Sequence, residues 1–405
     1  MTRQPGNPNR RRPFDMLRER IAENLATIKA AGLWRQLEPW PYPADSFHGQ
    51  FASNDYLALR AHPKVLEAFH QGLQKWGAGS GASPLVVGYS NAHHELTEQL
   101  ADWLGFDRVL LFSSGYAANQ GVLQTLQSVG AVPILDRFAH ASLYDGIKTL
   151  PVHRFKHNEL SDAKTKITSV KAQMPEGTPL LVSEGVFSMD GDSAPIAGLS
   201  ALVRQQNGLL FIDDAHGVGV TGERGRGAMD SRGSDGIDIL SGTFGKAFGL
   251  GGAFVASDQQ ICDYMVQKCR HLIYSTAFTG AQAMAIQASL GVIQAEPERR
   301  GMLTRNISRF RDYAAQLQLR LLPSSTPIQP LVIGTSELAL RLSHALRTEN
   351  IRCIAMRPPT VAKGTERLRF TLSAGHTETD IDALFSALVR IFHQDKELHE
   401  ACVVR

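Results

Sequence analysis

Short apolar runs alternate with longer amphipathic segments through the middle of the sequence, and this alternation constrains the fold more than any other feature. Six runs have the length of buried strands: 109–113 (VLLFS), 132–135, 179–183, 209–213 (LLFID), 237–241 and 252–257. Segments between them, such as 91–105 and 115–127, carry helical spacing. Strands that alternate with helices need crossover connections, so we expect an α/β fold with a mostly parallel, doubly wound sheet.

The pattern changes from about residue 290. A long helical stretch is followed by an apolar segment at 322–334, a helix at 336–350, a strand-like run at 367–373 and an amphipathic helix over 378–394. This order is typical of a small α+β domain. We therefore predict an N-terminal arm and helix over residues 1–60, a large domain over 61–290 and a small domain over 291–405.

Composition and charge exclude several classes of protein. The chain has 405 residues, a net charge of +3, 43% hydrophobic and 20% charged residues, as in a soluble globular protein with a large core. Arg10, Arg11 and Arg12 form a basic cluster that we interpret as a solvated arm, and the rest of the chain favours no nucleic-acid partner. The N-terminus lacks the apolar stretch of a signal peptide, and no apolar run is long enough to span a membrane. We expect a cytoplasmic protein with no membrane partner.

Cysteine usage agrees with that expectation. The four cysteines are scattered and show neither a Cys-x-x-Cys motif nor another metal-ligand spacing. We expect neither a disulfide framework nor a metal site, as in a reducing compartment.

Polar residues gather where four of the predicted strands end. In parallel sheets of this kind, ligands bind at the carboxyl ends of the strands. The segments that follow these ends are 113–116, 184–190, 213–216 and 241–246. The sequence therefore predicts a ligand site that collects residues from all four.

The segment 241–252 (SGTFGKAFGLGG) places one lysine, Lys246, among glycines, hydroxyl residues and two phenylalanines. A lysine amine does covalent chemistry only when it becomes neutral, and a partly desolvated site without a carboxylate partner lowers its pKa. Ser241 and Thr243 offer hydroxyl groups beside it. The alternative is an ordinary surface lysine in a glycine-rich loop.

The strand at 209–213 ends on Asp213, and His216 follows shortly after. A carboxylate at the end of a buried strand needs a partner. One such partner is a protonated ring nitrogen, as in pyridoxal phosphate, whose electron-sink chemistry depends on that proton. His216 would then reach the phenolic oxygen of the ring. The alternative is a capping aspartate with a loop histidine.

The segment 110–122 (LLFSSGYAANQGV) is a strand that runs through Ser-Ser-Gly into a helix. The backbone N–H groups at such a helix start are free and bind phosphate, and those of Gly115 and Tyr116 are the candidates. A dinucleotide fold would use the same physics. No Gly-x-Gly-x-x-Gly motif occurs here, however, and the GLGG at 249–252 precedes a strand, which is the wrong order.

Two further segments contribute polar residues beside the predicted site. His140, in 137–147, follows a strand and has the flat ring needed to stack on a flat cofactor, although a structural histidine is the commoner reading. In 183–195, Glu184 and Ser188 follow another strand, and a turn comes after them. The acidic residues of that turn lack the later ligands of an EF-hand, so we interpret it as a turn beside the site.

Taken in order, these segments resemble the α-oxoamine synthases, which are pyridoxal-phosphate enzymes of the aspartate-aminotransferase fold (fold type I). The resemblance runs from Ser53 to the segment 376–384 and rests on six motifs: GYAANQ, HASLYDG, EGVFSMDGD, DDAHGVGV, TFGKAFG and RHLIYST. Within the family, 356–377, with its RPPTV motif, is most similar to the acyltransferase of biotin synthesis that condenses L-alanine with a pimeloyl thioester.

The resemblance implies roles for individual residues around pyridoxal phosphate. Lys246 would hold the cofactor covalently, Asp213 would pair with the pyridinium nitrogen, His216 would contact the phenolic oxygen, and His140 would stack on the ring. The remaining cofactor contacts would come from Gly115, Tyr116 and Thr243 at the phosphate and from Ser188 in the pocket wall.

The resemblance also implies substrate contacts and a subunit interface. Arg357 would lie near the substrate carboxylate and help to orient that of L-alanine. Thr360 and His140 would line the substrate site, and Arg35 would reach it from the N-terminal segment. Arg369 is a second candidate carboxylate ligand, or else a structural residue. Relatives use the residue equivalent to Thr276 to reach the neighbouring subunit's phosphate, which implies a homodimer with the site at the interface.

Two departures from the family pattern bear on the substrate. Residues 84–87 (PLVV) replace more polar residues of many relatives, which affects the expected acyl-chain contacts. The segment 274–280 (YSTAFTG) lacks the prolines that often follow this serine-threonine pair. The acyl donor remains open, since pimeloyl-CoA and pimeloyl-acyl carrier protein are both anionic and suit a mildly basic chain.

Other functions remain as alternatives. Sibling enzymes of the glycine C-acetyltransferase, 5-aminolevulinate synthase and serine palmitoyltransferase types use other substrate pairs. An NAD-dependent oxidoreductase would share the parallel sheet but needs a glycine motif that the sequence lacks. A non-catalytic scaffold would be expected to lose Lys246 or Asp213, and both are present.

Overall fold

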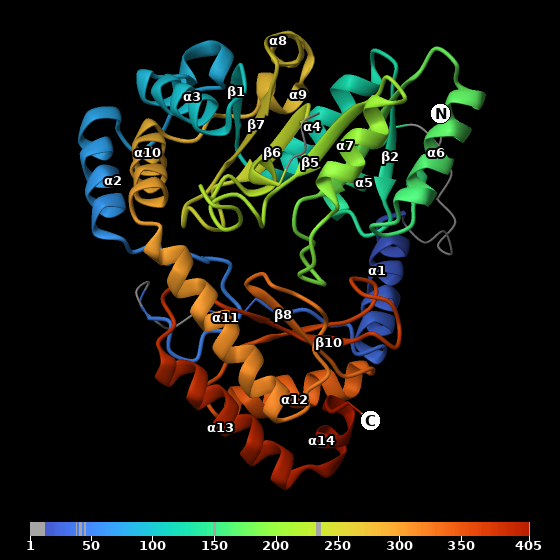
Figure 1. Cartoon of the computed structure of the whole chain (residues 1–405), viewed down its shortest axis with the longest axis vertical. Coiled ribbons are helices and arrows are strands. Elements are labelled where there is room, and N and C mark those ends of the chain that lie inside the picture. Colours follow the sequence, from blue (N-terminus) through green and yellow to red (C-terminus); the bar gives the residue numbers. More distant parts are fainter. Residues whose placement is uncertain are drawn as a thin grey trace, which may run out of the picture.

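The computed structural model describes residues 13–37, 39, 43, 46–148, 151–231 and 236–404. Figure 1 shows two layered regions, one above the other, joined by the long helix α11 (Glu298–Gln316). We call the upper one the large-sheet region and the lower one the small-sheet region. The basic cluster at Arg10–Arg12 lies outside the described residues.

The large-sheet region is built on seven strands in the order β1-β7-β6-β5-β4-β2-β3. The strands are β1 (Arg108–Phe112), β2 (Ala131–Asp136), β3 (His153–Phe155), β4 (Thr178–Glu184), β5 (Leu209–Asp213), β6 (Ile239–Thr243) and β7 (Ala253–Ser257). Neighbouring strands from β3 to β6 are parallel, and only β7 runs against its neighbours. The predicted mostly parallel α/β sheet is confirmed.

Helices cover both faces of this sheet because successive strand residues point to opposite sides. In β1, Leu110 packs in one core with α4 (Gly115–Gln127) and α8 (Gln259–Lys268), while Leu111 packs in the other. That second core contains side chains of the helices α3 (Asn91–Leu104), α6 (Leu160–Gln173), α7 (Ile196–Arg204) and α10 (Gly280–Ala295). The helix α2 (Pro63–Trp76) packs against it through Trp76. Burial on both faces explains why the strands appear in the sequence as continuous apolar runs.

The small-sheet region has three antiparallel strands in the order β8-β10-β9. They are β8 (Ile328–Val332), β9 (Ile354–Met356) and β10 (Arg367–Thr371). Three helices accompany them along the chain: α12 (Ser336–Thr348), α13 (Glu378–Gln394) and α14 (Lys396–Cys402). The central strand β10 is buried along its whole length, and its two arginines, Arg367 and Arg369, have polar partners within the protein.

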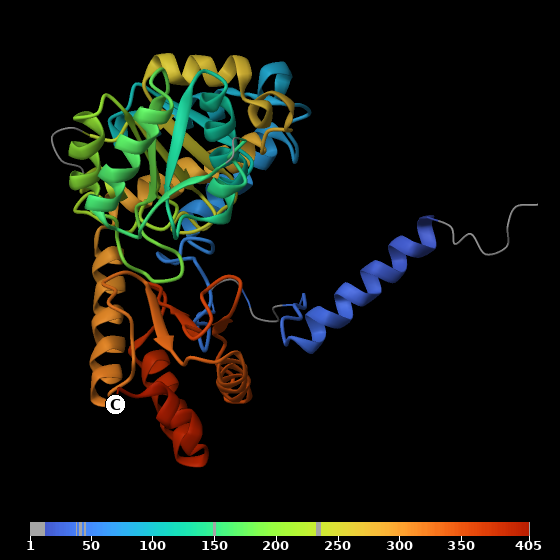
Figure 2. The same ribbon diagram turned by 90° about the vertical axis from the view of Figure 1, so that its right-hand side faces the viewer.

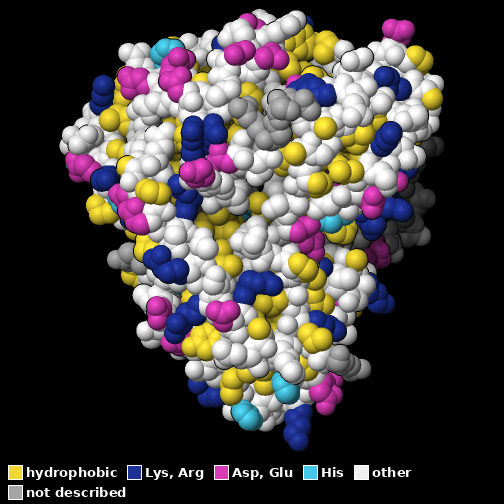
Figure 3. Space-filling view, in the orientation of Figure 1, with side chains coloured by type: hydrophobic (Ala, Val, Ile, Leu, Met, Phe, Trp, Pro, Cys, Tyr) yellow, Lys and Arg dark blue, Asp and Glu magenta, His cyan; other side chains and the backbone are white. Residues whose placement is uncertain are grey.

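The N-terminal helix α1 (Pro13–Ala30) differs from the rest, because none of its residues is buried. Figure 2 shows it extending away from both regions. In Figure 3 acidic and basic side chains are interspersed over the visible face, in keeping with the small net charge. Among the described helices, none is both long and apolar enough to cross a membrane.

Candidate active site

The site is set by the register of three parallel strands. Glu184 at the end of β4 lies opposite Asp213 at the end of β5, which in turn lies opposite Ser241 of β6. Lys246 follows β6. The predicted clustering of residues at the strand ends is therefore seen, with Asp213 in the middle.

Asp213 is almost fully buried, at 6% exposure, and its carboxylate is held on two sides. One oxygen accepts a hydrogen bond from the Asn119 side chain (2.6 Å), and the other accepts one from the backbone N–H of Ala215 (3.1 Å). Asn119 also receives a hydrogen bond from Ser241 (2.7 Å) and donates one to Ser142 (2.9 Å). This network fixes the carboxylate without neutralising it by a direct cation contact.

Burial lowers the pKa of the Lys246 amine from 10.5 to about 8, against the opposing charges of Asp213 and Glu184. Within the described part of the chain, no hydrogen bond to this amine is found. A lysine with these properties is neutral far more often than a surface lysine, which is what covalent chemistry requires. The alternative of an ordinary surface lysine is not supported.

His216 is buried and contacts the hydroxyl of Tyr56, with 2.5 Å between that oxygen and Nδ1. Burial, together with the charges of Lys246 and Arg369, lowers the pKa of His216 well below its ordinary value. Burial raises the pKa of Tyr56 to about 12, so its hydroxyl stays protonated, and its single proton has two acceptors in reach, Nδ1 of His216 and the side-chain oxygen of Asn54 (3.2 Å). In the arrangement in which this proton points to His216, Nδ1 is an acceptor. The second ring nitrogen, Nε2, is then the one that carries a proton.

His140 caps the short helix α5 (Ala141–Tyr144) and accepts a hydrogen bond from the backbone N–H of Ser142 (3.2 Å). Burial lowers its pKa, the nearby Asp213 charge opposes this, and the Lys246 charge adds to it. His140 therefore lies within the electrostatic reach of both groups at the centre of the site.

The start of α4 lies beside the end of β6. A Cβ added to Gly115 would lie 3.8 Å from the Cβ of Thr243. Ser114 caps the helix by accepting from Ala117, and the first backbone N–H groups, including those of Gly115 and Tyr116, have no acceptor within the helix. The Tyr116 ring stands edge-on to His140, with 6.1 Å between ring centres. The free backbone donors of α4 thus lie next to Thr243, as at a phosphate site, although the Thr243 hydroxyl itself donates to the carbonyl oxygen of Gly252 (3.0 Å).

Arg369 of β10 reaches the site from the small-sheet region. It is buried at 4% exposure, donates from Nε to the carbonyl oxygen of Ser188 (2.7 Å), and donates to the Asn54 side chain (3.3 Å). Its charge acts on Tyr56, His216 and Lys246. These two hydrogen bonds suit a structural arginine, and the nearness of its charge to Lys246 suits a carboxylate ligand, so both predicted roles for Arg369 stay open.

Three sequence-predicted residues lie apart from this group. Arg357 follows β9 and hydrogen-bonds to the carbonyl oxygen of Gly32, and its pKa is lowered by burial and by the neighbouring charge of Arg35. Thr360 is exposed and its backbone bonds to Arg357. In the described residues, none of the three hydrogen-bonds to Lys246, Asp213 or His216.

The predicted interface residue Thr276 lies elsewhere too. It lines a cavity of about 280 Å³ beside β1, together with residues such as Leu85, Tyr89 and His271. Leu85 and its neighbours Val86 and Val87 are largely exposed. This cavity lies on the edge strand of the large sheet.

Sequence reasoning did not assign a role to Tyr56 or Asn119. Both are buried polar residues with partners in the site. Asn119 had a detectable signal, since it occupies an apolar face of a predicted helix and buried amides need partners. Tyr56 had none, because its partner His216 lies 160 residues away.

The arrangement fits pyridoxal phosphate. The Lys246 amine, whose pKa is lowered, suits the cofactor's aldehyde, and the buried Asp213 carboxylate suits its ring nitrogen. The neutral His216 suits the phenolic oxygen, and the start of α4 beside Thr243 suits the phosphate. In addition, one oxygen of the buried Glu184 carboxyl has no hydrogen-bond partner among the described residues. That oxygen leaves capacity for a donor brought by a bound group.

Known proteins share this architecture. A family model described as aminotransferase class I and II matches residues 50–388. The 8-amino-7-oxononanoate synthase of Cronobacter sakazakii (strain ATCC BAA-894) is 48% identical over 340 residues, 84% of this chain and 88% of the relative.

Two solved structures extend the similarity to three dimensions. A serine palmitoyltransferase from S. paucimobilis, with bound PLP, aligns with a TM-score of 0.84 and 26% identity over 95% of this chain and 99% of that one. The 8-amino-7-oxononanoate synthase of Francisella tularensis aligns with a TM-score of 0.72 and 28% identity over 87% and 97%. The predicted fold type I, the cofactor pyridoxal phosphate and the resemblance to α-oxoamine synthases are confirmed. This chain belongs to the aminotransferase class I and II family.

Proposed function

We propose that this protein condenses L-alanine with a pimeloyl thioester to give 8-amino-7-oxononanoate. A bond forms between the alanine Cα and the pimeloyl carbonyl carbon, the thiol leaves, and the alanine carboxyl group departs as carbon dioxide. The observation that carries the proposal is the Lys246 amine, with its pKa of about 8, beside the buried Asp213 carboxylate, in a chain 48% identical to a synthase of that product.

Pyridoxal phosphate, when bound, supplies a protonated ring that accepts the electron pair left by a broken Cα–H bond. Asp213 would hold the ring nitrogen proton, and the Asn119 hydrogen bond keeps its carboxylate aimed. The Lys246 amine would remove the proton from the alanine Cα, because its lowered pKa makes it a usable base near neutral pH. The same amine can return a proton after carbon dioxide has left.

His216 and His140 would orient the ring between them. With the Tyr56 hydroxyl donating to Nδ1 of His216, the Nε2–H of His216 would donate to the phenolic oxygen. His140, held by Ser142, would present its ring face. Gly115, Tyr116 and Thr243 would bind the phosphate, and Ser188 would line the wall.

Arginines at two places suit the two carboxylates of the substrates. We propose Arg369, in place of Arg357, as the ligand of the alanine carboxylate. Arg369 acts electrostatically on Lys246, whereas among the described residues no hydrogen bond joins Arg357 to the central group. Arg357 and Arg35 lie close enough for their charges to interact, and an anion between them would relieve that repulsion. The distal carboxylate of the pimeloyl group has this charge. Thr360 would line the same part of the substrate site.

A homodimer forms part of the proposal. The exposed apolar residues of 85–87 and the cavity that contains Thr276 lie together beside the edge strand β1. A second subunit placed there would bring Thr276 to its partner's cofactor phosphate. Light scattering of the purified protein would show a dimer mass.

The first test is the absorption spectrum of the purified protein with pyridoxal phosphate, titrated with L-alanine, glycine and L-serine. We expect a visible band that responds to L-alanine at the lowest concentration. Product formation is then measured with pimeloyl-CoA and with pimeloyl-acyl carrier protein, and release of 8-amino-7-oxononanoate from either supports the proposal.

One observation favours a second candidate. The serine palmitoyltransferase alignment covers 95% of this chain, and the exposed apolar side chains of 85–87 would suit a long acyl chain. Turnover of L-serine with palmitoyl-CoA, and none with pimeloyl thioesters, would replace the first proposal by this one.

A further inference from the structure

The turn at 185–193, between β4 and α7, lies at the junction of the two regions. It is closed by hydrogen bonds from Phe187 N–H to Asp192 O and from Gly191 N–H to Phe187 O, both 2.9 Å. The sequence predicted a turn here, and Gly191 adopts a φ of +72° that favours glycine. The turn carries Ser188, whose carbonyl oxygen accepts the hydrogen bond from Arg369.

The small-sheet region holds one side of this turn. Arg367 of β10 is buried and forms an ion pair with Asp190. The carbonyl oxygen of Gly191 accepts hydrogen bonds from the hydroxyls of Ser324 (2.8 Å) and Thr326 (2.9 Å). A Cβ on Gly191 would come within 2.4 Å of the Ile328 carbonyl oxygen, so the turn fits tightly against β8.

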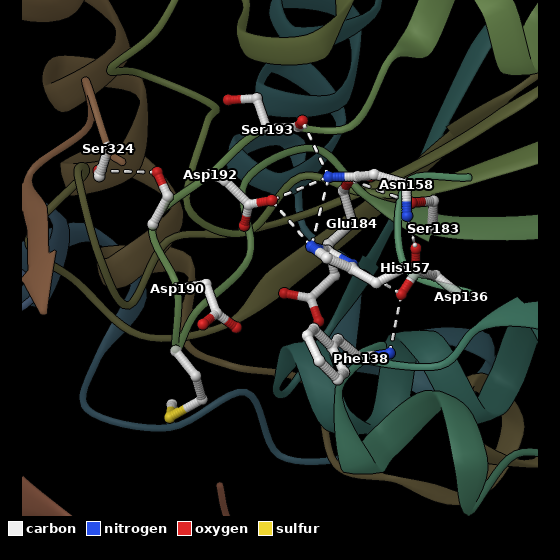
Figure 4. Close-up of polar contacts among 12 residues, drawn as sticks. Asp136, Phe138, His157, Asn158, Ser183, Glu184, Asp190, Asp192, Ser193 and Ser324 are labelled. Carbon is white, nitrogen blue, oxygen red and sulfur yellow. Dashed lines mark hydrogen bonds and ion pairs between the residues drawn. The ribbon is translucent and has the colours of Figure 1, made fainter. Parts of the chain in front are cut away.

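The large-sheet region holds the other side through His157, which follows β3. Figure 4 shows this ring between two carboxylates: Nδ1 lies 3.0 Å from Asp136 at the end of β2, and Nε2 lies 2.8 Å from Asp192 of the turn. The ring packs against Phe138 and Phe187, with ring centres 4.5 and 4.4 Å apart. Asp136 is fully buried.

Both ring nitrogens of His157 donate only when the ring is protonated. Burial would lower the pKa of His157, but the hydrogen bonds and charges of Asp136 and Asp192 outweigh it and raise the pKa to about 9. The Asp136 carboxylate also accepts from the backbone N–H groups of Phe138 (2.8 Å) and Asn158 (2.9 Å). The Asp136 carboxylate is thus fixed at the end of β2, and His157, bonded to both carboxylates, holds Asp192 at a fixed distance from it.

We infer that His157 is a positioning residue for recognition of the amino-acid carboxylate. By joining Asp136 to Asp192 it fixes the turn against the large sheet, and through the Ser188–Arg369 hydrogen bond it sets the Arg369 guanidinium relative to Lys246. This inference rests on the proposed role of Arg369 but not on which acyl group is transferred. Neither His157 nor Asp192 touches the reacting atoms.

The test compares His157→Gln and Asp192→Asn with Asp238→Asn as the matched control. Asp238 pairs with Arg204 (2.6 Å) and accepts from the Leu210 backbone (2.6 Å), so it is another ion-paired aspartate of the large-sheet region. It precedes β6, whereas Lys246 follows that strand, so it lies at the end of the sheet away from the site.

We expect both turn variants to raise the KM for L-alanine roughly tenfold with little change in kcat, because a misplaced guanidinium weakens ground-state and transition-state binding alike. The Asn158 side chain also donates to the Asp192 carboxylate (2.8 Å), so Asp192→Asn weakens two contacts of the turn and His157→Gln removes one of them. The double variant should therefore raise KM no further than Asp192→Asn alone. Asp238→Asn should leave KM unchanged. Hydrogen exchange of the cofactor-free variants should accelerate at residues 187–193 and not in β4.

The inference would be overturned if either folded turn variant kept the wild-type KM for L-alanine. It would also be overturned if Asp238→Asn raised this KM as much as the turn variants do, or if the turn variants lowered kcat by the same factor by which they raise KM. If His157→Gln does not fold, Asp192→Asn decides, because its side chain is partly exposed. If the wild-type spectrum responds to glycine or L-serine instead of L-alanine, the proposed substrate is wrong. The same comparison is then made with the responding amino acid, whose carboxylate Arg369 would still bind.

Discussion

Two groups of polar residues in this protein are built in opposite ways. The strand-end cluster, which comprises Glu184, Asp213, His216 and Lys246, is buried or half-buried on rigid strands and the loops that leave them. The exposed group, which comprises Arg35, Arg357 and Thr360, lies on loops, and its only described internal bonds are to backbone atoms. The buried cluster suits chemistry common to pyridoxal-phosphate enzymes, while the exposed group suits choice of substrate, where water weakens each contact.

Lys246→Ala should have the largest effect on activity. Removal of the amine takes away both the covalent anchor and the base, so kcat should fall by at least about a thousandfold. Steady-state turnover with L-alanine and a pimeloyl thioester measures this, and circular dichroism checks that the variant is folded. Activity within tenfold of wild type would remove Lys246 from the proposed mechanism and the strand-end cluster from its central role.

The same lysine should destabilise the folded state of the cofactor-free protein. Its folded-state pKa of about 8 lies below the ordinary value of 10.5, so between these values the unfolded chain binds more protons and stability rises with pH. Below pH 8 the charged amine destabilises the folded state by up to about 3 kcal/mol. Lys246→Met should therefore raise the Tm at pH 7, and this gain should shrink toward pH 10.5.

An exposed lysine provides the control for that measurement. Lys164→Met on α6 should give no gain that varies with pH, because the Lys164 side chain is exposed. A gain for Lys246→Met that stayed constant from pH 7 to 10 would show that the amine is not desolvated in the folded state.

Tyr56→Phe tests whether the buried network around the cluster matters beyond the cluster itself. Without the hydroxyl, Nδ1 of His216 loses its hydrogen-bond partner and the ring is free to adopt either tautomer. We expect kcat to fall about tenfold, which is about 1.4 kcal/mol of transition-state stabilisation. Tyr313→Phe, which removes a hydroxyl bonded to Asp382 in α13, should leave kcat unchanged. Equal kcat in both variants would mean that Tyr56 only packs.

The same contrast explains what could be predicted from the sequence. Strand ends could be located because apolar runs stop abruptly there, so Asp213 and Lys246 were found without a structure. The partners Tyr56 and Asn119 depend on contacts across the fold, which no local pattern encodes. The short strands β3 and β9 were not predicted from the sequence for another reason: three residues are too few to show a hydrophobic period.

Arginines were the hardest residues to assign from sequence. Arg357 follows β9 and Arg369 lies within the strand-like run 367–373, and both were candidates for a carboxylate ligand. Only the pairing of β10 in the centre of its sheet buries Arg369 and turns it toward Ser188. Tertiary position, rather than local spacing, separates the two.

Arg357→Gln should have the smallest effect and sharpens the contrast most. Because Arg357 is only half-buried, solvent screens its charge, and we expect the KM for the pimeloyl thioester to rise roughly threefold with kcat and the KM for L-alanine unchanged. The rise should shrink at high salt. A thioester whose distal carboxyl is capped as a methyl ester provides the control, since wild type and variant should then have the same KM. A fall in kcat comparable to that of Tyr56→Phe would instead place Arg357 with the strand-end cluster, and the separation of chemistry from substrate choice would fail.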